Sequence, residues 1–397
     1  MAHALGGDSG ALARLMTAMF DAAKTGFDIS IGLVGIMALW LGLMKIGERA
    51  GMIDAFARGA NPLFRHLFPG VPRGHPAQGA MTMNMSANLL GLDNAATPLG
   101  LKAMQALQTL NDKPDTATNA QIMFLVLNTA GLTLIPTSVI AIRQTLAVKQ
   151  GLTGFNAADI FLPTLIATAG GLLSALAMVA IVQRLPLWRA ALLLPLGALA
   201  AVMGALLWWL SRLPPDQAAQ AMGVAGAGFV LAVVALFLLA GTVRRVNVYE
   251  AFVDGAKEGF GVAVQIIPYL VAMLVAIAAF RAAGLMDALM GVIAAAVTAL
   301  GLPTDFLPAV PVGLMKVLSG SGARGLMVDV MQTHGVDSFA GKLAAIIQGS
   351  TETTFYVLAV YFGSVGVKHT RHALPCALLA DAAGLLIAIA VAYAFFT

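Results

Sequence analysis

Residues whose side chains could bind a polar solute gather in four segments of an otherwise apolar chain. Two of these segments, residues 313–327 and 348–364, lie in the last quarter of the chain. The candidate substrate-binding residues there are Lys316, Ser319, Ser321, Arg324, Gln348, Ser350, Thr351, Glu352 and Thr353. A charge at the centre of a bilayer is costly, so an ionisable residue within an apolar segment usually has a function. Glu352 is therefore the strongest single candidate, with a structural ion pair to Lys316 or Arg324 as the alternative.

The other two segments, residues 84–104 and 128–138, lie in the first half of the chain. Their candidates for the same role are Asn84, Ser86, Asn88, Asp93, Asn94, Asn128 and Thr129. Asn, Ser and Thr side chains also join membrane helices to one another, at about 0.6 kcal/mol for each hydrogen bond. For each of these residues, helix packing and substrate contact both stay open as interpretations.

Other patterns that could support catalysis or metal binding are weaker. Lys316 and Ser319 share one helix face and could form a hydrolase dyad, but no partner acid or oxyanion loop is recognisable. His369 and His372 have a spacing compatible with a metal ion, although their charged neighbours favour a solvated loop. The single cysteine, Cys376, excludes a disulfide within the chain. We therefore expect no catalytic residue, no cofactor and no metal site.

The composition indicates a membrane protein. Hydrophobic residues make up 59% of the 397 residues and charged residues only 11%, whereas soluble proteins carry about 25% charged residues. Each of four uncharged runs is long enough to span a bilayer as a helix; they are residues 160–183, 190–211, 217–243 and 259–280. The excess of basic residues is explained by cytoplasmic loops, so no nucleic-acid partner is expected. The sequence predicts an all-α polytopic membrane protein.

An internal repeat follows from three matches along the chain. The offset between the matching segments falls steadily from 233 to 213 residues. The matching segments are 26–55 with 259–288, 124–136 with 346–358, and 171–175 with 384–388. This pattern predicts two repeats, at residues 26–183 and 259–397, of which the second is shortened. Many transporters contain inverted repeats, so we expect inversion here.

Two further segments complete the predicted organisation. Residues 184–258 form a connector with two spans, and arginines flank this hairpin at both ends. The positive-inside rule puts both of those ends in the cytoplasm. Residues 1–25 lack the pattern of a signal peptide and are expected to lie on the membrane as an amphipathic helix.

The four polar segments are expected to interrupt the membrane helices. Gly91 with Asp93 and Asn94 forms one turn-forming cluster, and residues 319–322 form another. Non-helical backbone occurs at membrane depth only inside the protein or beside a water-filled cavity. We therefore predict broken or re-entrant helices whose ends and polar side chains form a site near the middle of the membrane.

These motifs resemble two known families. NMSANLLGLDNAATPLGLKAM (84–104) resembles the signature of the spore maturation protein A family. MKVLSGSGARG (315–325) and GSTETTFYVLAVYFGSVGVK (349–368) resemble that of the spore maturation protein B family. The chain is therefore similar to a natural fusion of the two, in that order and over nearly its whole length. Both belong to the nucleoside-recognition (Gate) group, which is similar to parts of concentrative nucleoside transporters and of ferrous-iron transport protein B.

The resemblance implies a transporter-like protein of the bacterial inner membrane with one Gate-type domain in each repeat. Both families are linked to dehydration of the spore core, so the expected substrate is a small polar or anionic solute. We expect a secondary transporter whose site lies between the repeats, because no ATP-binding motif is present. A proton or a sodium ion would be the coupling ion, through Glu352. A homo-oligomer stays open.

Two other functions stay open as alternatives. One is a membrane scaffold for envelope or spore maturation, which would have polar residues packed in helix contacts and no accessible cavity. The other is an intramembrane hydrolase, which would need Ser319 and Lys316 within hydrogen-bond reach of each other. A polar cavity lined by both repeats would favour the transporter.

Overall fold

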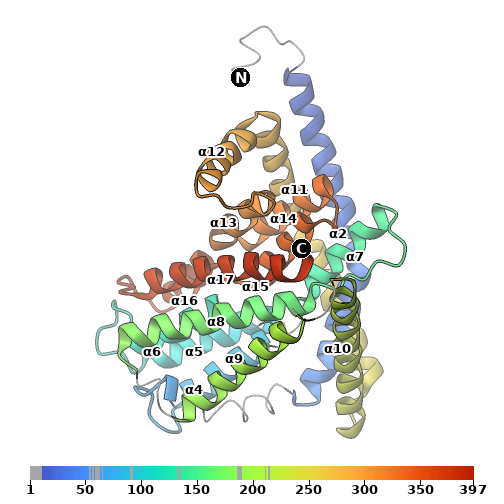
Figure 1. Cartoon of the computed structure of the whole chain (residues 1–397). Coiled ribbons are helices and arrows are strands. Elements are labelled where there is room, and N and C mark those ends of the chain that lie inside the picture. The colour runs from blue at the N-terminus through green and yellow to red at the C-terminus, as the bar shows by residue number, and fades with distance from the viewer. Residues whose placement is uncertain are drawn as a thin grey trace.

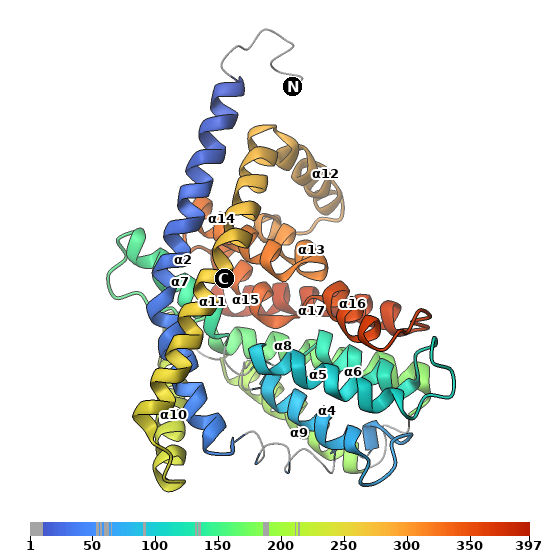
Figure 2. The same ribbon diagram turned by 180° about the vertical axis from the view of Figure 1, so that it is seen from behind.

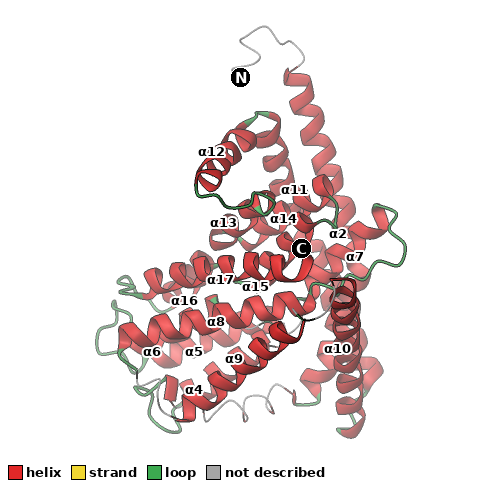
Figure 3. Cartoon of the chain, in the orientation of Figure 1, coloured by secondary structure: helices red, strands yellow, loops and turns green. Residues whose placement is uncertain are grey.

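The fold comes from a computed structural model of the chain. It describes residues 11–52, 55, 58, 63–64, 66–89, 93–131, 133, 136–185, 190–210, 212 and 215–397. Regular structure in these residues is helical apart from a single bridge between Thr116 and His369, as Figure 3 shows. Five helical segments are long and apolar enough to span a bilayer: Leu12–Arg49, Phe161–Gln183, Val224–Val243, Phe339–Ser364 and Ala373–Phe396. The predicted all-α polytopic membrane class is confirmed.

The helices divide into a first half, a connector and a second half along the chain (Figure 1). The first half contains α2 (Ala11–Arg49), α4 (Pro76–Leu89), α5 (Asp93–Gln108), α6 (Asn119–Thr129), α7 (Thr137–Lys149) and α8 (Phe161–Gln183). The connector contains α9 (Ala190–Leu210) and α10 (Pro215–Val243). The second half contains α11 (Val248–Ala282), α12 (Leu285–Ala299), η1 (Leu307–Ala309), α13 (Val310–Leu318), α14 (Gly320–His334), α15 (Phe339–Ser350), α16 (Thr354–Ser364) and α17 (Ala373–Phe396).

α2 and α11 form a long antiparallel pair, which both views show side by side (Figures 1 and 2). Gly26 of α2 lies against Val271, and Ala38 lies against Gly259, so the contacts run in opposite directions along the two helices. A Cβ atom on Gly259 would be 2.7 Å from the Ala38 Cα. Glycine is therefore needed here for the two backbones to approach, as is common between membrane helices.

Under the repeat predicted from the sequence, α11 is the counterpart of α2, and the two helices run antiparallel. With an offset of 233 residues, Gly259 is the counterpart of Gly26, and Val271 is the counterpart of Ala38. The contact of Gly26 with Val271 is therefore the symmetry mate of the contact of Ala38 with Gly259. Self-complementary contacts of this kind arise across a two-fold axis. They support the inverted repeat, which remains an interpretation of the sequence.

α8 and α17 form a second antiparallel pair with the same property. Gly171 of α8 lies against Gly384 of α17, which is its own counterpart at the offset of 213 residues. Beside this contact, Gly170 lies against Ile387. Because a residue contacts its own counterpart only at a symmetry axis, the axis of the predicted repeat would pass between Gly171 and Gly384.

The predicted interruptions of the helices are present. Ser319 alone separates α13 from α14, and residues 351–353 separate α15 from α16. In the first half, α4 ends before residue 90 and α5 begins at Asp93, while residues 130–136 separate α6 from α7. The turn predicted at Gly91 lies outside the described residues.

The interruption between α6 and α7 lies beside the one between α15 and α16. Backbone groups at both interruptions form hydrogen bonds with other parts of the protein. The Glu352 N–H donates to the Thr129 carbonyl oxygen at 3.0 Å. The Thr168 hydroxyl of α8 donates to the Gly131 carbonyl oxygen at 2.9 Å. Non-helical backbone groups thus find partners inside the protein, as the bilayer requires.

Two predicted boundaries fall inside helices. α2 continues without a break through residues 25 and 26, so the described part of the predicted amphipathic segment, residues 11–25, is the beginning of this helix. α11 likewise continues through residues 258 and 259. In both places the helix runs through a glycine, Gly26 or Gly259, which costs about 1 kcal/mol relative to alanine but does not end the helix.

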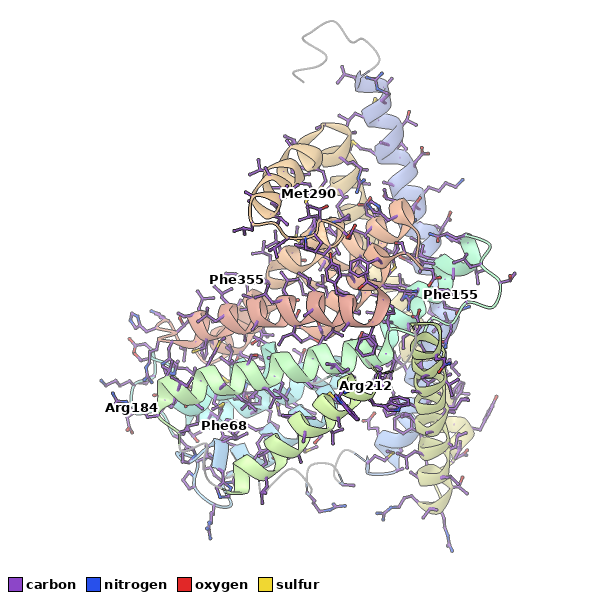
Figure 4. The ribbon with its side chains drawn as sticks, viewed as in Figure 1. Phe68, Phe155, Arg184, Arg212, Met290 and Phe355 are labelled. Carbon is purple, nitrogen blue, oxygen red and sulfur yellow. The ribbon has the colours of Figure 1, made fainter. Side chains whose placement is uncertain are left out.

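A buried arginine stabilises the loop that follows α7 through direct contacts. Arg143 is fully buried, forms an ion pair with Asp159 and donates to the Ala157 carbonyl oxygen at 3.0 Å. Its guanidinium also lies 5.0 Å from the centre of the Phe155 ring, which Figure 4 shows at the edge of the molecule near α7. Lys342 of α15 approaches the same Asp159 carboxylate at 3.7 Å. The sequence analysis did not single out this cluster.

We expect Gly255→Ala in α11 to destabilise the protein. A Cβ atom there would be 2.2 Å from the Leu41 carbonyl oxygen of α2, and overpacking typically costs about 1–3 kcal/mol. Gly261→Ala is the matched control, because it lies on the same helix and a Cβ atom there meets nothing within 4 Å. Its effect should be neutral or a gain of up to about 1 kcal/mol in helix propensity. Thermal unfolding in detergent measures both variants, and equal shifts would contradict the close packing of α2 on α11.

Candidate functional site

A polar cavity of about 500 Å³ lies where the interrupted helices of the two halves meet. We call it the central cavity. It is lined by Asn88, Ala96, Thr97, Asn128, Lys316, Leu318, Ser319, Gly320, Ser321, Arg324, Gln348, Glu352, Thr353, Tyr356, Val357 and Tyr361. Its walls therefore come from α4, α5 and α6 of the first half and from α13, α14, α15 and α16 of the second. It is large enough to hold a small organic solute.

Hydrogen bonds between asparagines and a tyrosine join the two halves beside the cavity. Asn84 donates to the Ala96 carbonyl oxygen at 2.7 Å and to the Tyr361 hydroxyl at 3.3 Å. The Tyr361 hydroxyl in turn donates to Asn128 Oδ1 at 3.2 Å. Asn88 donates to the same oxygen at 2.8 Å. The network ties α16 of the second half to α4 and α6 of the first.

The second half presents two helix N-termini to the cavity. Ser319 caps α14, and its hydroxyl accepts from the Gly322 N–H at 3.1 Å. Thr353 occupies the corresponding position of α16. The two ends are close together, because a Cβ atom on Gly320 would lie 2.8 Å from the Thr353 hydroxyl oxygen. Helix N-termini favour anions through their backbone N–H groups and the helix dipole.

A second, narrower cavity of about 70 Å³ adjoins the central one. Four residues line both cavities: Lys316, Arg324, Gln348 and Glu352. The remaining walls of the narrow cavity come mainly from Thr133 and residues 136–139, before and at the start of α7. A solute in either cavity would therefore meet the same four side chains.

Gln348 has an acceptor available at this position. Its side chain is 5% exposed, and its Oε1 atom has no hydrogen-bond partner among the described residues. Its Nε2 atom is 3.5 Å from the Gly320 carbonyl oxygen, which is long for a hydrogen bond. A buried polar atom without a partner is costly. A donor group of a bound solute would satisfy it.

Two cations and one carboxylate line both cavities. Lys316 is 6% exposed and faces both cavities with Arg324, while Glu352 supplies one negative charge there. Together with the two helix N-termini, the two cations make the described part of the site favourable to an anionic group. The amides and hydroxyls around them can bind polar groups of the same solute.

The structure brings together many of the residues predicted from the sequence. Those that line the central cavity are Asn88, Asn128, Lys316, Ser319, Ser321, Arg324, Gln348, Glu352 and Thr353. Glu352 lies in the interruption between α15 and α16. The side chains of Asp93 and Asn94 lie outside the described part of the chain.

Five predicted residues do not line either cavity. Ser86, Thr129 and Ser350 donate to carbonyl oxygens three or four residues earlier in their own helices. The Cγ2 atom of Thr351 faces the α17 backbone, 3.0 Å from where a Cβ atom on Gly384 would lie. Asn84 is fully buried and supports the cavity through its bonds to neighbours. These positions serve packing in the structure.

Three polar lining residues are absent from the set predicted from the sequence: Thr97, Tyr356 and Tyr361. Tyr361 is the most informative of them. Aromatic residues of a membrane protein commonly belong to its core or to the membrane interface. A tyrosine within an apolar span must, however, find a partner for its hydroxyl group. That requirement was a usable signal.

The described residues contain no group of three or more His, Cys, Asp or Glu side chains that could hold a metal ion. His369 lies 3.8 Å from Asp115, and His372 lies 3.1 Å from the Gln183 amide. Burial and the nearby Arg371 lower the pKa of His372 below its ordinary value. Each histidine thus has its own separate neighbours in the loop before α17.

Comparisons with known proteins agree with the motifs. The model of a family described as nucleoside recognition (Gate) matches residues 30–146 and 263–368. Spore maturation protein B of Bacillus subtilis (strain 168) is 46% identical over 159 residues, which are 40% of this chain and 88% of that protein. Spore maturation protein A of the same organism is 43% identical over 160 residues, 40% of this chain and 79% of that protein. No solved structure matches.

We expect Tyr361→Phe to lower the free energy of unfolding by about 1 kcal/mol, the usual value of a hydrogen bond between neutral groups. The change removes the hydroxyl between Asn84 and Asn128 but keeps the ring stacked on Phe124. Tyr356→Phe is the matched control on the same helix, because its side chain is 53% exposed. Detergent-induced unfolding measures both, and equal stability of the two variants would contradict the network.

Proposed function

The chain belongs to the nucleoside-recognition (Gate) family, and from this premise we propose that it is a secondary transporter of a small polar or anionic solute. The solute would bind in the central cavity, between the two halves. The family's name does not decide whether that solute is a nucleoside. The proposal rests on the chemistry of the cavity.

The observation that carries the proposal is the placement of Gln348. Its unpartnered Oε1 atom lies in a buried site that faces both the central and the narrow cavity. A scaffold would gain nothing from an unsatisfied acceptor, which costs free energy. A binding site uses such an atom to select a donor group of its ligand.

Different residues around Gln348 would bind different groups of the solute. Lys316, Arg324 and the N-termini of α14 and α16 would hold an anionic group. Asn88 and Asn128, on the opposite wall, would hold polar groups. Glu352 would limit the net positive charge and could accept from a donor group. A solute with one anionic end and one polar end suits this arrangement.

The position of the four shared residues suits alternating access. A transporter exposes one site to each side of the membrane in turn, commonly by moving one repeat against the other. Lys316, Arg324, Gln348 and Glu352 line both the wide and the narrow cavity. A movement that widened the narrow cavity and closed the central one would expose the same four residues to the other side. A proton or a sodium ion would drive this movement.

The hydrolase alternative receives less support from the site. The Ser319 hydroxyl accepts from the Gly322 N–H and lies 3.2 Å from the Ser321 hydroxyl. It thus serves as a helix cap. A reactive serine would instead need a general base in contact with that hydroxyl.

A ligand screen followed by uptake tests the proposal. We expect at least one compound among nucleosides, amino acids, dicarboxylates and dipicolinate-like compounds to raise the melting temperature of the purified protein. A ligand at one hundred times its Kd stabilises the native state by about 2.7 kcal/mol. The same compound should accumulate in proteoliposomes under an imposed proton or sodium gradient. Binding without gradient-dependent uptake would overturn the proposal, and so would the absence of any ligand.

Variants then locate the binding site. Gln348→Leu should weaken binding about tenfold, which corresponds to about 1.4 kcal/mol for one lost hydrogen bond. Lys316→Gln and Arg324→Gln should weaken the binding of an anionic compound by a larger factor, because hydrogen bonds to charged groups are stronger. Lys102→Gln is the control, since Lys102 is exposed and lines neither cavity. An equal loss of affinity in Lys102→Gln would show that the solute does not bind in the central cavity.

A further inference from the structure

Asp381 is a buried acidic residue that the proposed binding site leaves without a role. It lies on α17, a helix long and apolar enough to span the bilayer. Its side chain is 7% exposed, and no other Asp or Glu in the described part of the chain is buried to this degree. A carboxyl group in such a place is expensive, and in membrane proteins it commonly marks the path of an ion or a proton.

The contacts of Asp381 place it directly behind the interruption between α15 and α16. The hydroxyl of Thr354, which is fully buried, donates to Asp381 Oδ2 at 2.6 Å. Thr354 is the first residue of α16 and follows the non-helical residues 351–353. One turn further along α17, Gly384 packs against Thr351. Asp381 therefore bonds the residue that directly follows the segment carrying Glu352, and it is not among the residues that line the central cavity.

Lys316 links Asp381 to the central cavity. Its ammonium group acts electrostatically on the Asp381 carboxylate, and it also lines both cavities. One cation is thus placed to interact with a buried carboxylate on one side and with the contents of the site on the other.

The other helices packed against α17 bring few charges to Asp381. α6 and α8 contain no ionisable residue, and α10 contains only Asp216 in its first turn. α16 contributes Tyr356 and Tyr361. On α15 the only ionisable residue is Lys342, which pairs with Asp337 at 2.9 Å and with Asp159 at 3.7 Å. On α13 it is Lys316.

We propose that Asp381 binds the coupling proton of this protein and that Lys316 is shared between Asp381 and an anionic group in the central cavity. The second part rests on the proposed transport of a solute. The proton leaves a hydronium ion, whose O–H bond breaks to release water, and forms an O–H bond at the Asp381 carboxylate. No oxidation or reduction takes place.

The proposal gives a simple rule for coupling. When Asp381 is ionised, its negative charge attracts the Lys316 ammonium and lowers the attraction of that ammonium for an anion. Protonation of Asp381 removes this competition, so the proton and the anion favour each other's binding. The two effects are equal by thermodynamic linkage, and couplings between sites are typically about 5–150-fold. Thr354, which bonds Asp381, would transmit the change to α16.

Burial distinguishes Asp381 from Glu352, the residue that the sequence suggested for coupling. Glu352 is partly exposed and lines both cavities. A carboxylate in contact with water can stay ionised at little cost, whereas a buried one depends on its partners for its charge. Asp381 is therefore suited to bind a proton when the Lys316 ammonium interacts with an anion in the cavity, and to release it when the ammonium interacts with Asp381.

Infrared difference spectroscopy of the protein without any solute tests the proton site. The protein is reconstituted in ether lipids, which lack ester carbonyls, and spectra are recorded as the pH is lowered. We expect the carbonyl band of a protonated buried carboxyl group to appear in the wild type and in Glu352→Gln. It should be absent from Asp381→Asn, whose amide oxygen can still accept from Thr354, and should return in Asp381→Glu. A band lost in Glu352→Gln and kept in Asp381→Asn would overturn the proposal.

Two further variants test the role of the neighbours. Thr354→Val should shift the frequency of the band, because the carboxyl group loses its hydrogen bond. Lys316→Gln should make the band persist to higher pH, because a nearby positive charge favours the ionised form. No change in Lys316→Gln would refute the sharing of Lys316. These measurements need no substrate, so they can fail while the ligand screen succeeds, and the reverse also holds.

Discussion

Backbone that leaves the helical path at membrane depth must find its hydrogen bonds within the protein. Here the Glu352 N–H donates across the two halves to the Thr129 carbonyl oxygen, and Thr168 donates to Gly131 within the first half. The bond between Glu352 and Thr129 holds the ends of α6 and α15 together. As a result Asn128 and Gln348, one residue and four residues away, face the same cavity. The site depends on this meeting of two interrupted helices more than on any one side chain.

The paired helices supply the frame for that meeting. α2 packs on α11, and α8 packs on α17, through glycines that bring backbones close together. Both pairs are antiparallel, and their contacts follow the symmetry expected of counterparts in a repeat. An axis through Gly171 and Gly384 would relate the interruption after α6 to the one after α15. This relation explains why an inner surface made from two different sequences can close around a single cavity.

Several features of the fold and site could be predicted from the sequence alone. Lys316, Arg324, Gln348 and Glu352 stand out because polar residues are costly in apolar segments, and they meet at the cavity. Ser86, Thr129 and Ser350 carry the same signal, but their hydroxyls bond within their own helices. The sequence does not distinguish these two outcomes, since both use the same residue types. Tyr361 and Arg143 depend on distant partners, which composition and spacing do not reveal.

The pairing of α2 with α11 also has a consequence for biosynthesis. α2 leaves the ribosome first, whereas its partner begins only at Val248. At about 5–20 residues per second, α11 follows on the order of ten to forty seconds later. During that interval α7 and α10, which also pack on α2, are made, but the face of α2 that carries Gly26 and Gly42 still lacks α11. The first long helix of the chain must therefore persist in the membrane as an unfinished half, and its lifetime there would limit the yield of folded protein.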